Sequence, residues 1–238
     1  MSKSKLRIQQ PIVHKNYVRI ADKITRVLSK KAGKIEDLSV LDWGAQTGVV
    51  SSLLLDRGFY DITLYDVGYE PDTSRFKNLE TVRKKYGGDP VEIPFPDNSF
   101  DVVLSVGVLE HVPFPHSSLE EIHRILKPDG RLLVFHFPQK WSITEFIASF
   151  HSASGHVRKL SVRELYILLT LNGFEPLKFW KFNFLPKTLY GLPVWIVSIY
   201  SFLTPVIYAL DHFVSRIPLL NLFCNSIEVD CIKREAFG

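Results

Sequence analysis

The segment Leu41-Asp-Trp-Gly-Ala-Gln-Thr-Gly48 decides the fold class of this chain. The apolar run 39–43 is typical of a buried strand, and Gly44 and Gly48 allow a tight turn that leads into a helix over 47–57. The spacing differs from the GxGxxG of nicotinamide sites, and the chain contains no GxxxxGK[ST] phosphate loop. Taken alone, the segment suits either a ligand-binding loop or an ordinary strand-to-helix turn.

Strand-like and helix-like segments alternate on both sides of this loop. Capping boxes that begin at Ser118, Ser142 and Ser161 mark helix starts. We expect strands over 39–43, 62–66, 100–106, 131–137, 174–179 and 227–233, and helices over 47–57, 75–86, 118–126 and 161–173. This alternation predicts an α/β fold, with a mostly parallel sheet that helices cover on both faces. Ligands of such sheets bind beyond the carboxyl ends of the strands.

The composition narrows the class of protein. The chain has 238 residues, of which 46% are hydrophobic and 23% charged, and these values exclude a disordered protein. Two cysteines, Cys224 and Cys231, are too few for a disulfide framework or a structural zinc cluster, and we expect no metal site. A reduced, cytoplasmic protein is the expectation.

Positive charge is concentrated at the N-terminus. Residues 1–38 hold ten Lys or Arg and three Asp or Glu, a net charge of +7, whereas the whole chain has +4. Apolar residues at helical spacing over 17–28 predict a basic amphipathic helix. This helix suits either docking on the domain with its basic face in solvent, or attraction to anionic lipid or RNA phosphates. No RNA-binding module accompanies the helix, so we consider nucleic acid the less favoured partner.

An uncharged stretch of 23 residues, 188–210, precedes the last predicted strand. Its length suits a membrane span, but Pro193 and Pro205 interrupt it. A single crossing would also separate strand 227–233 from its sheet. We therefore expect either helices that form a lid over the ligand pocket or a monotopic membrane contact, against the alternatives of extra core or a homodimer interface.

Four blocks carry a family resemblance: VLDWGAQTG (40–48), ITLYDVGYEP (62–71), DPVEIPFPDNSFDVVLSVGVLEHV (89–112) and LEEIHRILKPDGRLLV (119–134). In this order they resemble the class I S-adenosylmethionine (SAM)-dependent methyltransferases, specifically the methyltransferase type 11 group. The resemblance runs from about residue 40 to 179. It implies a Rossmann-like fold with a mostly parallel seven-stranded sheet, a last strand antiparallel beside the fifth, and SAM as cofactor.

The resemblance also implies roles for single residues. Asp42, Gly44 and Gly48 would surround the methionine part of SAM, and Asp66 would hold the ribose hydroxyls. Val67 would border the adenine and Asp89 would lie near its amino group. Ser105 and Val106 would lie near the amino and methylthio end of SAM.

The family's middle glycine is Gln46 here, whose side chain would either crowd the methionine part or form a hydrogen bond with it.

Fewer residues are candidates for contact with the methyl acceptor than for contact with SAM. An oxygen or nitrogen acceptor needs a base for its proton, and His111, His136 and His156 are the candidates. We expect His111 to be the base, because it follows the fourth strand of the family in the LEHV segment, whereas the apolar strand around His136 favours a core role. His156, Arg158 and Trp141 are the candidate substrate-binding residues.

We divide the chain into a basic helical extension (1–38), a SAM-binding core (39–180), a hydrophobic helical insertion (181–226), and the last strand with the C-terminus (227–238). The expected function is methyl transfer from SAM to a small-molecule acceptor, apolar or lipid-linked, at a membrane surface that the protein contacts peripherally. The alternative is a non-catalytic binding or membrane-scaffold protein with the same fold, which Gln46 favours. An RNA methyltransferase is less favoured.

Overall fold

The computed structural model describes residues 11–30, 34–68, 70, 77–79, 82–89, 91–143, 146, 158–185 and 194–234. A seven-stranded sheet with the order β3-β2-β1-β4-β5-β7-β6 runs through the molecule. The strands are β1 (Ser39–Trp43), β2 (Asp61–Asp66), β3 (Arg83–Tyr86), β4 (Phe100–Val106), β5 (Leu126–Pro138), β6 (Phe174–Phe182) and β7 (Ser226–Lys233). β1 to β5 pair in parallel and β7 pairs antiparallel with β5 and β6. The predicted α/β class and the antiparallel last strand are confirmed.

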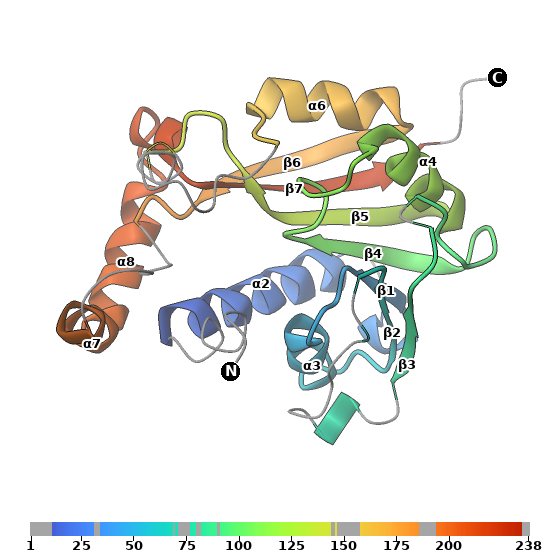
Figure 1. Cartoon of the computed structure of the whole chain (residues 1–238), viewed down its shortest axis with the longest axis horizontal. Helices are drawn as coiled ribbons and strands as arrows, with labels where there is room; N and C mark the ends of the chain where they lie inside the picture. The colour runs from blue at the N-terminus through green and yellow to red at the C-terminus, as the bar shows by residue number, and fades with distance from the viewer. Residues whose placement is uncertain are drawn as a thin grey trace.

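Helices cover both faces of the sheet (Figure 1). The helices α2 (Pro11–Ser29) and α3 (Val49–Leu55) lie on one face, and α4 (Pro115–Ile125) and α6 (Val162–Leu171) lie on the other. Ile20 and Ile24 of α2 are fully buried against Val40 of β1 and Leu133 of β5. Each face therefore has its own apolar core, and the N-terminal helix forms part of one of them.

Two predictions about local structure are wrong. The expected helix over 75–86 is a short 3-10 helix η2 (Lys77–Leu79) followed by β3, which pairs with β2 from Thr63↔Arg83 to Asp66↔Tyr86. β3 is an exposed edge strand, so its four residues, Arg83, Lys84, Lys85 and Tyr86, lack the apolar alternation of a covered strand. The helix expected from Ser118 begins at Pro115, because proline suits the first helical position, and the Ser118 hydroxyl is buried inside it.

The capping box predicted at Ser161 is confirmed. Ser161 and Glu164 form the capping box of α6, in which each side chain accepts a hydrogen bond from the backbone N–H of the other. Residues 127–130 form a bulge in β5, because β4 pairs with Leu126 and then with Arg131. Most of the helix expected from Ser142 lies outside the described residues.

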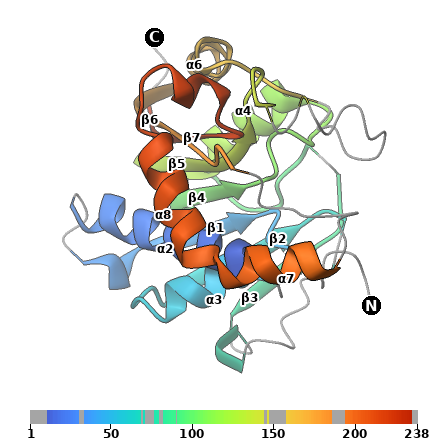
Figure 2. The ribbon, with the colours of Figure 1, turned by 90° about the vertical axis from the view of Figure 1, so that its left-hand side faces the viewer.

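The insertion between β6 and β7 contains α7 (Val194–Phe202), α8 (Thr204–Val214) and a 3-10 helix η3 (Leu220–Phe223). It leaves and re-enters the sheet where Phe182 pairs with Ser226, and Ser226 also pairs with Pro138 at the carboxyl end of β5. α7 and α8 therefore extend from the end of the sheet where the parallel strands finish (Figures 1 and 2). Within the described segments, none of the helices has both the length and the apolar character needed to cross a membrane.

Three basic side chains of α2 face the rest of the protein. Arg19 and Lys23 both pair with Glu228 of β7, whose side chain is fully buried, and Lys15 lies over the ring of Tyr208 at 5.0 Å. Burial alone would raise the pKa of Glu228, but the two cations overcome it and lower this pKa to about 2. Burial lowers the pKa of Lys23, and the charge and hydrogen bond of Glu228 oppose this change. The expected docking of the helix is present, but these three cations do not form a solvated basic face.

Candidate functional site

The Asp66 carboxylate links the loops that follow β1 and β2. Its Oδ2 accepts a hydrogen bond from the backbone N–H of Gln46 (3.1 Å), and its Oδ1 accepts one from Gly68 (2.9 Å). The backbone N–H groups of Gly44 and Ala45 donate to the Tyr65 carbonyl at 2.8 and 3.1 Å. The end of β2 thus fixes the course of the loop after β1.

Gln46 keeps the backbone course that a glycine would give. Its φ is 47°, in the left-handed region where glycine is favoured, and its side chain is exposed. The loop therefore keeps its left-handed turn at this position without a glycine. The two outcomes expected for Gln46, crowding of the methionine part or a hydrogen bond to it, stay predictions.

The glycines allow close packing around the loop. A Cβ on Gly44 would lie 2.3 Å from Cγ2 of Val108, and a Cβ on Gly48 would lie 2.7 Å from Cδ2 of Leu64. Gly44 therefore lets the loop after β4 approach the loop after β1, and Gly48 lets the start of α3 lie directly on β2. The contact of Val108 with Gly44 had no signal in the sequence.

Asp42 at the end of β1 is buried and turned toward α3. Its Oδ2 accepts a hydrogen bond from the Ser51 hydroxyl at 2.6 Å. Burial raises the pKa of Asp42 to about 6, the Ser51 hydrogen bond opposes the rise, and the neighbouring charge of Asp66 adds to it. Asp42 orders the junction of β1 with α3.

This shifted pKa predicts a pH-dependent contribution to stability. The folded protein holds a proton on Asp42 that the unfolded chain releases, so the free energy of unfolding falls by up to about 3 kcal/mol as pH rises from 4 to 6. Asp42→Asn removes this contribution. We expect the stability of the variant relative to wild type, from urea denaturation, to increase by roughly 2–3 kcal/mol between pH 4 and pH 7.5. A pH-independent difference would contradict the assignment.

The remaining cofactor candidates lie at the same edge of the sheet. Ser105 of β4 pairs with Trp43, and its buried Oγ has no hydrogen-bond partner among the described residues. Val67 and Val106 are partly buried and pack on opposite cores. Asp89 accepts hydrogen bonds from the N–H groups of Val91 and Glu92, and its charge reaches Tyr65, whose pKa is raised first by burial and then by nearby carboxylates including Asp89.

These residues fit SAM. The Asp66 oxygens can accept further hydrogen bonds from ribose hydroxyls, since a carboxylate offers about four lone-pair positions. The buried Ser105 Oγ supplies a polar atom that needs a partner. Gly44 and Gly48 keep the backbone free of side chains that would collide with the neighbouring elements. Within the described residues no cluster of metal-ligating side chains was found.

The acceptor-side candidates lie in different places. His111 follows β4, its side chain is 56% exposed, and its Nε2 lies 3.8 Å from Oε1 of Glu110. Arg158 uses Nη1 to donate to the carbonyls of Leu109 and Val112, at 3.2 and 2.9 Å, and so holds the loop that carries His111. Trp141 is exposed beyond the end of β5. His156 lies outside the described residues.

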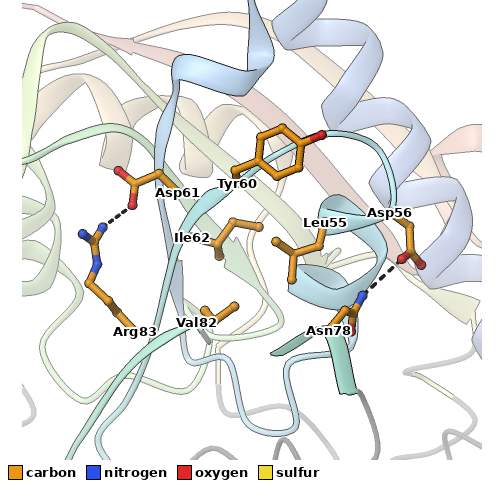
Figure 3. A pocket seen from close by; sticks show the side chains of 8 residues that line it. All are labelled: Leu55, Asp56, Tyr60, Asp61, Ile62, Asn78, Val82 and Arg83. Carbon is orange, nitrogen blue, oxygen red and sulfur yellow. Dashed lines mark hydrogen bonds and ion pairs between the residues drawn. The ribbon is translucent and has the colours of Figure 1, made fainter. Parts of the chain in front are cut away.

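An open depression of about 580 Å³ lies at the opposite end of the sheet (Figure 3). Tyr60, Asp61 and Arg83 line it at the amino ends of β2 and β3, and the ion pair of Asp61 with Arg83 lies on one side. Asn78 donates to Asp56 at 3.1 Å on the other side. Since Asp66 lies at the far end of β2, this depression has no part in the site described above.

Comparison with known proteins gives a consistent result. The family described as "Methyltransferase domain" matches residues 12–178. A ubiquinone biosynthesis O-methyltransferase of Yersinia enterocolitica is 35% identical over 107 residues, which are 43% of this chain and 44% of that protein. The chain spans less than half the length of the curated relatives it matches.

Solved structures share the fold. The YcgJ protein from Bacillus subtilis has a TM-score of 0.59 at 24% identity, covering 89% of this chain and 98% of that one. A 1,6-didemethyltoxoflavin-N1-methyltransferase of Burkholderia thailandensis, solved with S-adenosylhomocysteine, has a TM-score of 0.57 at 19% identity and covers 92% and 79%. The Rossmann-like architecture is therefore shown beyond the sequence match.

Proposed function

This chain belongs to the methyltransferase domain family, and we propose that it transfers a methyl group from SAM to a small-molecule acceptor that is apolar or lipid-linked. The Asp66 carboxylate is the observation that carries the proposal. It lies at the end of β2, where the family resemblance implies a ribose-binding acid, and it already orders the loops on both sides through Gln46 and Gly68. The intact loop argues for a cofactor-binding protein.

The residues at the strand ends would have separate roles in cofactor binding and in proton transfer. SAM would supply a methyl group bound to a positively charged sulfur, which is already electrophilic. Asp66 would accept hydrogen bonds from the ribose, and Ser105 would do so from the amino group. The protein's main contribution is to place acceptor and methyl group in line. His111 would take the acceptor's proton, and its exposure lets it release that proton to solvent.

Titration calorimetry with SAM tests this function. We expect one molecule of SAM or of S-adenosylhomocysteine to bind per chain. Absence of binding at millimolar concentrations would reject the enzyme and favour a non-catalytic protein with this fold.

The insertion supports an apolar acceptor and a peripheral membrane contact. On α7, Trp195, Ile199 and Phe202 are exposed at helical spacing, and on α8 Val206 and Phe213 are exposed. Asp211 is the only acidic residue between 194 and 223, and it is buried, where its Oδ1 accepts a hydrogen bond from Leu185 N–H at 2.6 Å. An apolar surface without exposed acids, at the end of the sheet where the acceptor would bind, suits a lipid surface.

Vesicle flotation tests the membrane contact. We expect the protein to float with vesicles that contain phosphatidylglycerol, and the triple variant Phe202→Ser, Phe213→Ser, Leu219→Ser to lose most of this binding. All three side chains are more than 60% exposed, so the fold should tolerate the changes. Leu171→Ser, at an equally exposed leucine on α6, is the control and should float like wild type. Equal flotation of the triple variant would reject the membrane role.

A further inference from the structure

His136 has an unusual backbone conformation near the end of β5. Its φ is 63°, in the left-handed region that residues other than glycine rarely adopt. It lies where the pairing of β5 with β7 shifts register, between Val134 and Phe137. The residue is half-buried and faces α2, where its ring lies 5.9 Å from that of Tyr17. Strained residues of this kind concentrate at functional sites.

A chain of polar contacts holds the imidazole. Arg19 donates from Nη1 to Oε2 of Glu228 at 3.0 Å and from Nε to Oδ1 of Asn16 at 3.2 Å. The Asn16 side chain is buried, and because its Oδ1 accepts from Arg19, its Nδ2 faces Nε2 of His136. An amide nitrogen can only donate, so Nε2 accepts and the proton of the neutral ring lies on Nδ1.

His136 also stands beside the end of β4. The backbone N–H of Gly107 donates to the carbonyl of Phe135 at 2.9 Å, and a Cβ on Gly107 would lie 3.9 Å from the Cβ of His136. Gly107 directly follows Ser105 and Val106, which the family resemblance places near the amino and methylthio end of SAM. The backbone and Cβ of His136 therefore lie beside the strand end where the methyl group would be transferred.

We propose that Glu228, Arg19 and Asn16 hold His136 as the neutral Nδ1–H tautomer, and that this N–H donates a hydrogen bond to the acceptor's nucleophilic oxygen. The proposal rests on the proposed function and deepens it. A hydrogen-bond donor stabilises an anionic oxygen more than a neutral one, so the favoured acceptor is an acidic hydroxyl, a phenol or an enol. Asn16 and Arg19 are positioning residues, because they act through His136.

The chemical step balances with His111 as the base. The hydroxyl proton passes to His111, and the anionic oxygen keeps its lone pairs. One lone pair forms the new oxygen–carbon bond, the carbon–sulfur bond breaks, and its electron pair goes to sulfur. His136 keeps its proton throughout, because the Nε2 lone pair is already engaged by Asn16.

Nitrogen-15 NMR of the histidine rings tests the tautomer without any acceptor. We expect the wild-type His136 to show the Nδ1–H pattern at pH 7.5. Asn16→Asp should convert it to a ring protonated at Nε2, because a carboxylate can only accept. Asn172→Asp is the matched control, since Asn172 Nδ2 contacts Nδ1 of His116 at 3.0 Å, and it should leave His136 unchanged. A wild-type Nε2–H tautomer, or no response to Asn16→Asp, would overturn the proposal.

Two additions test the position and the acceptor class. Saturating S-adenosylhomocysteine should shift the ring signals of His136 but not those of His123, which contacts the Arg234 carbonyl at the far end of β7. If calorimetry shows no cofactor binding, the proposed function fails while the tautomer result stands.

Binding of 4-nitrophenol to the cofactor complex tests the acceptor class. We expect visible absorbance to show that the pKa of the bound phenol is lowered, and Asn16→Asp should abolish this shift. No binding or an unshifted pKa would overturn the acidic-hydroxyl acceptor.

Discussion

Glu228→Gln is expected to lower the free energy of unfolding by about 3–5 kcal/mol at pH 7, which is the cost of removing one partner of a buried ion pair. The Glu228 side chain is fully buried in β7, and Arg19 and Lys23 contribute the two cations that face it. With glutamine in its place, both cations would keep their burial and lose their counter-charge. Urea denaturation followed by circular dichroism measures the change.

The pH dependence separates this charge effect from a packing defect. The pKa of Glu228 is lowered to about 2 in the folded protein, so its stabilisation is complete above the ordinary glutamate pKa and is lost as pH falls toward 2. The difference between variant and wild type should therefore shrink below pH 4. Glu175→Gln is the control, since Glu175 pairs with Arg234 on the surface, and it should cost less than about 1 kcal/mol. A pH-independent loss would indicate packing instead.

Asp66→Ala is expected to weaken SAM binding by about 100-fold or more. Hydrogen bonds to a charged group contribute roughly 1.5–3 kcal/mol each, and the variant loses the bonds to the ribose hydroxyls. It also releases the backbone of Gln46 and Gly68, which Asp66 holds at 3.1 and 2.9 Å. Titration calorimetry of folded protein with SAM provides the measurement.

The control for Asp66→Ala lies in the same strand. Asp61→Ala removes a carboxylate from the other end of β2, where Asp61 pairs with Arg83 at the surface. This variant should bind SAM like wild type. If Asp66→Ala and Asp61→Ala had the same affinity as wild type, Asp66 would not be the ribose-binding acid.

The sequence predicts the sheet well where both faces of a strand are covered. β1, β4 and β7 appear as apolar or alternating runs, because their side chains enter the two cores. β3 has neither an apolar run nor an alternating pattern. All four of its residues are exposed, and their pattern does not distinguish a strand from a helix. Its existence depends on pairing with β2, which is a tertiary property.

The site is predicted in part for the same reason. Asp66, Gly44 and Gly48 could be predicted because they belong to a motif at the end of a strand. A contact between side chains 100 or 200 residues apart in the sequence cannot be predicted from the local pattern around either residue. From the sequence, Arg19 and Lys23 are predicted to lie on a solvated basic face. In the structure both contact Glu228 of β7. The left-handed φ of His136 and its contact with Asn16 likewise depend on the register shift in β5 and on the docking of α2.

The position of β7 has a consequence for biosynthesis. β7 lies between β5 and β6 and carries the counter-charge for the first described helix. Until residues 226–233 have left the ribosome, β5 and β6 each present an open edge and Arg19 has no Glu228 to pair with. Nascent chains that stall before this strand would expose unpaired backbone, so we expect them to require chaperones that full-length chains can release.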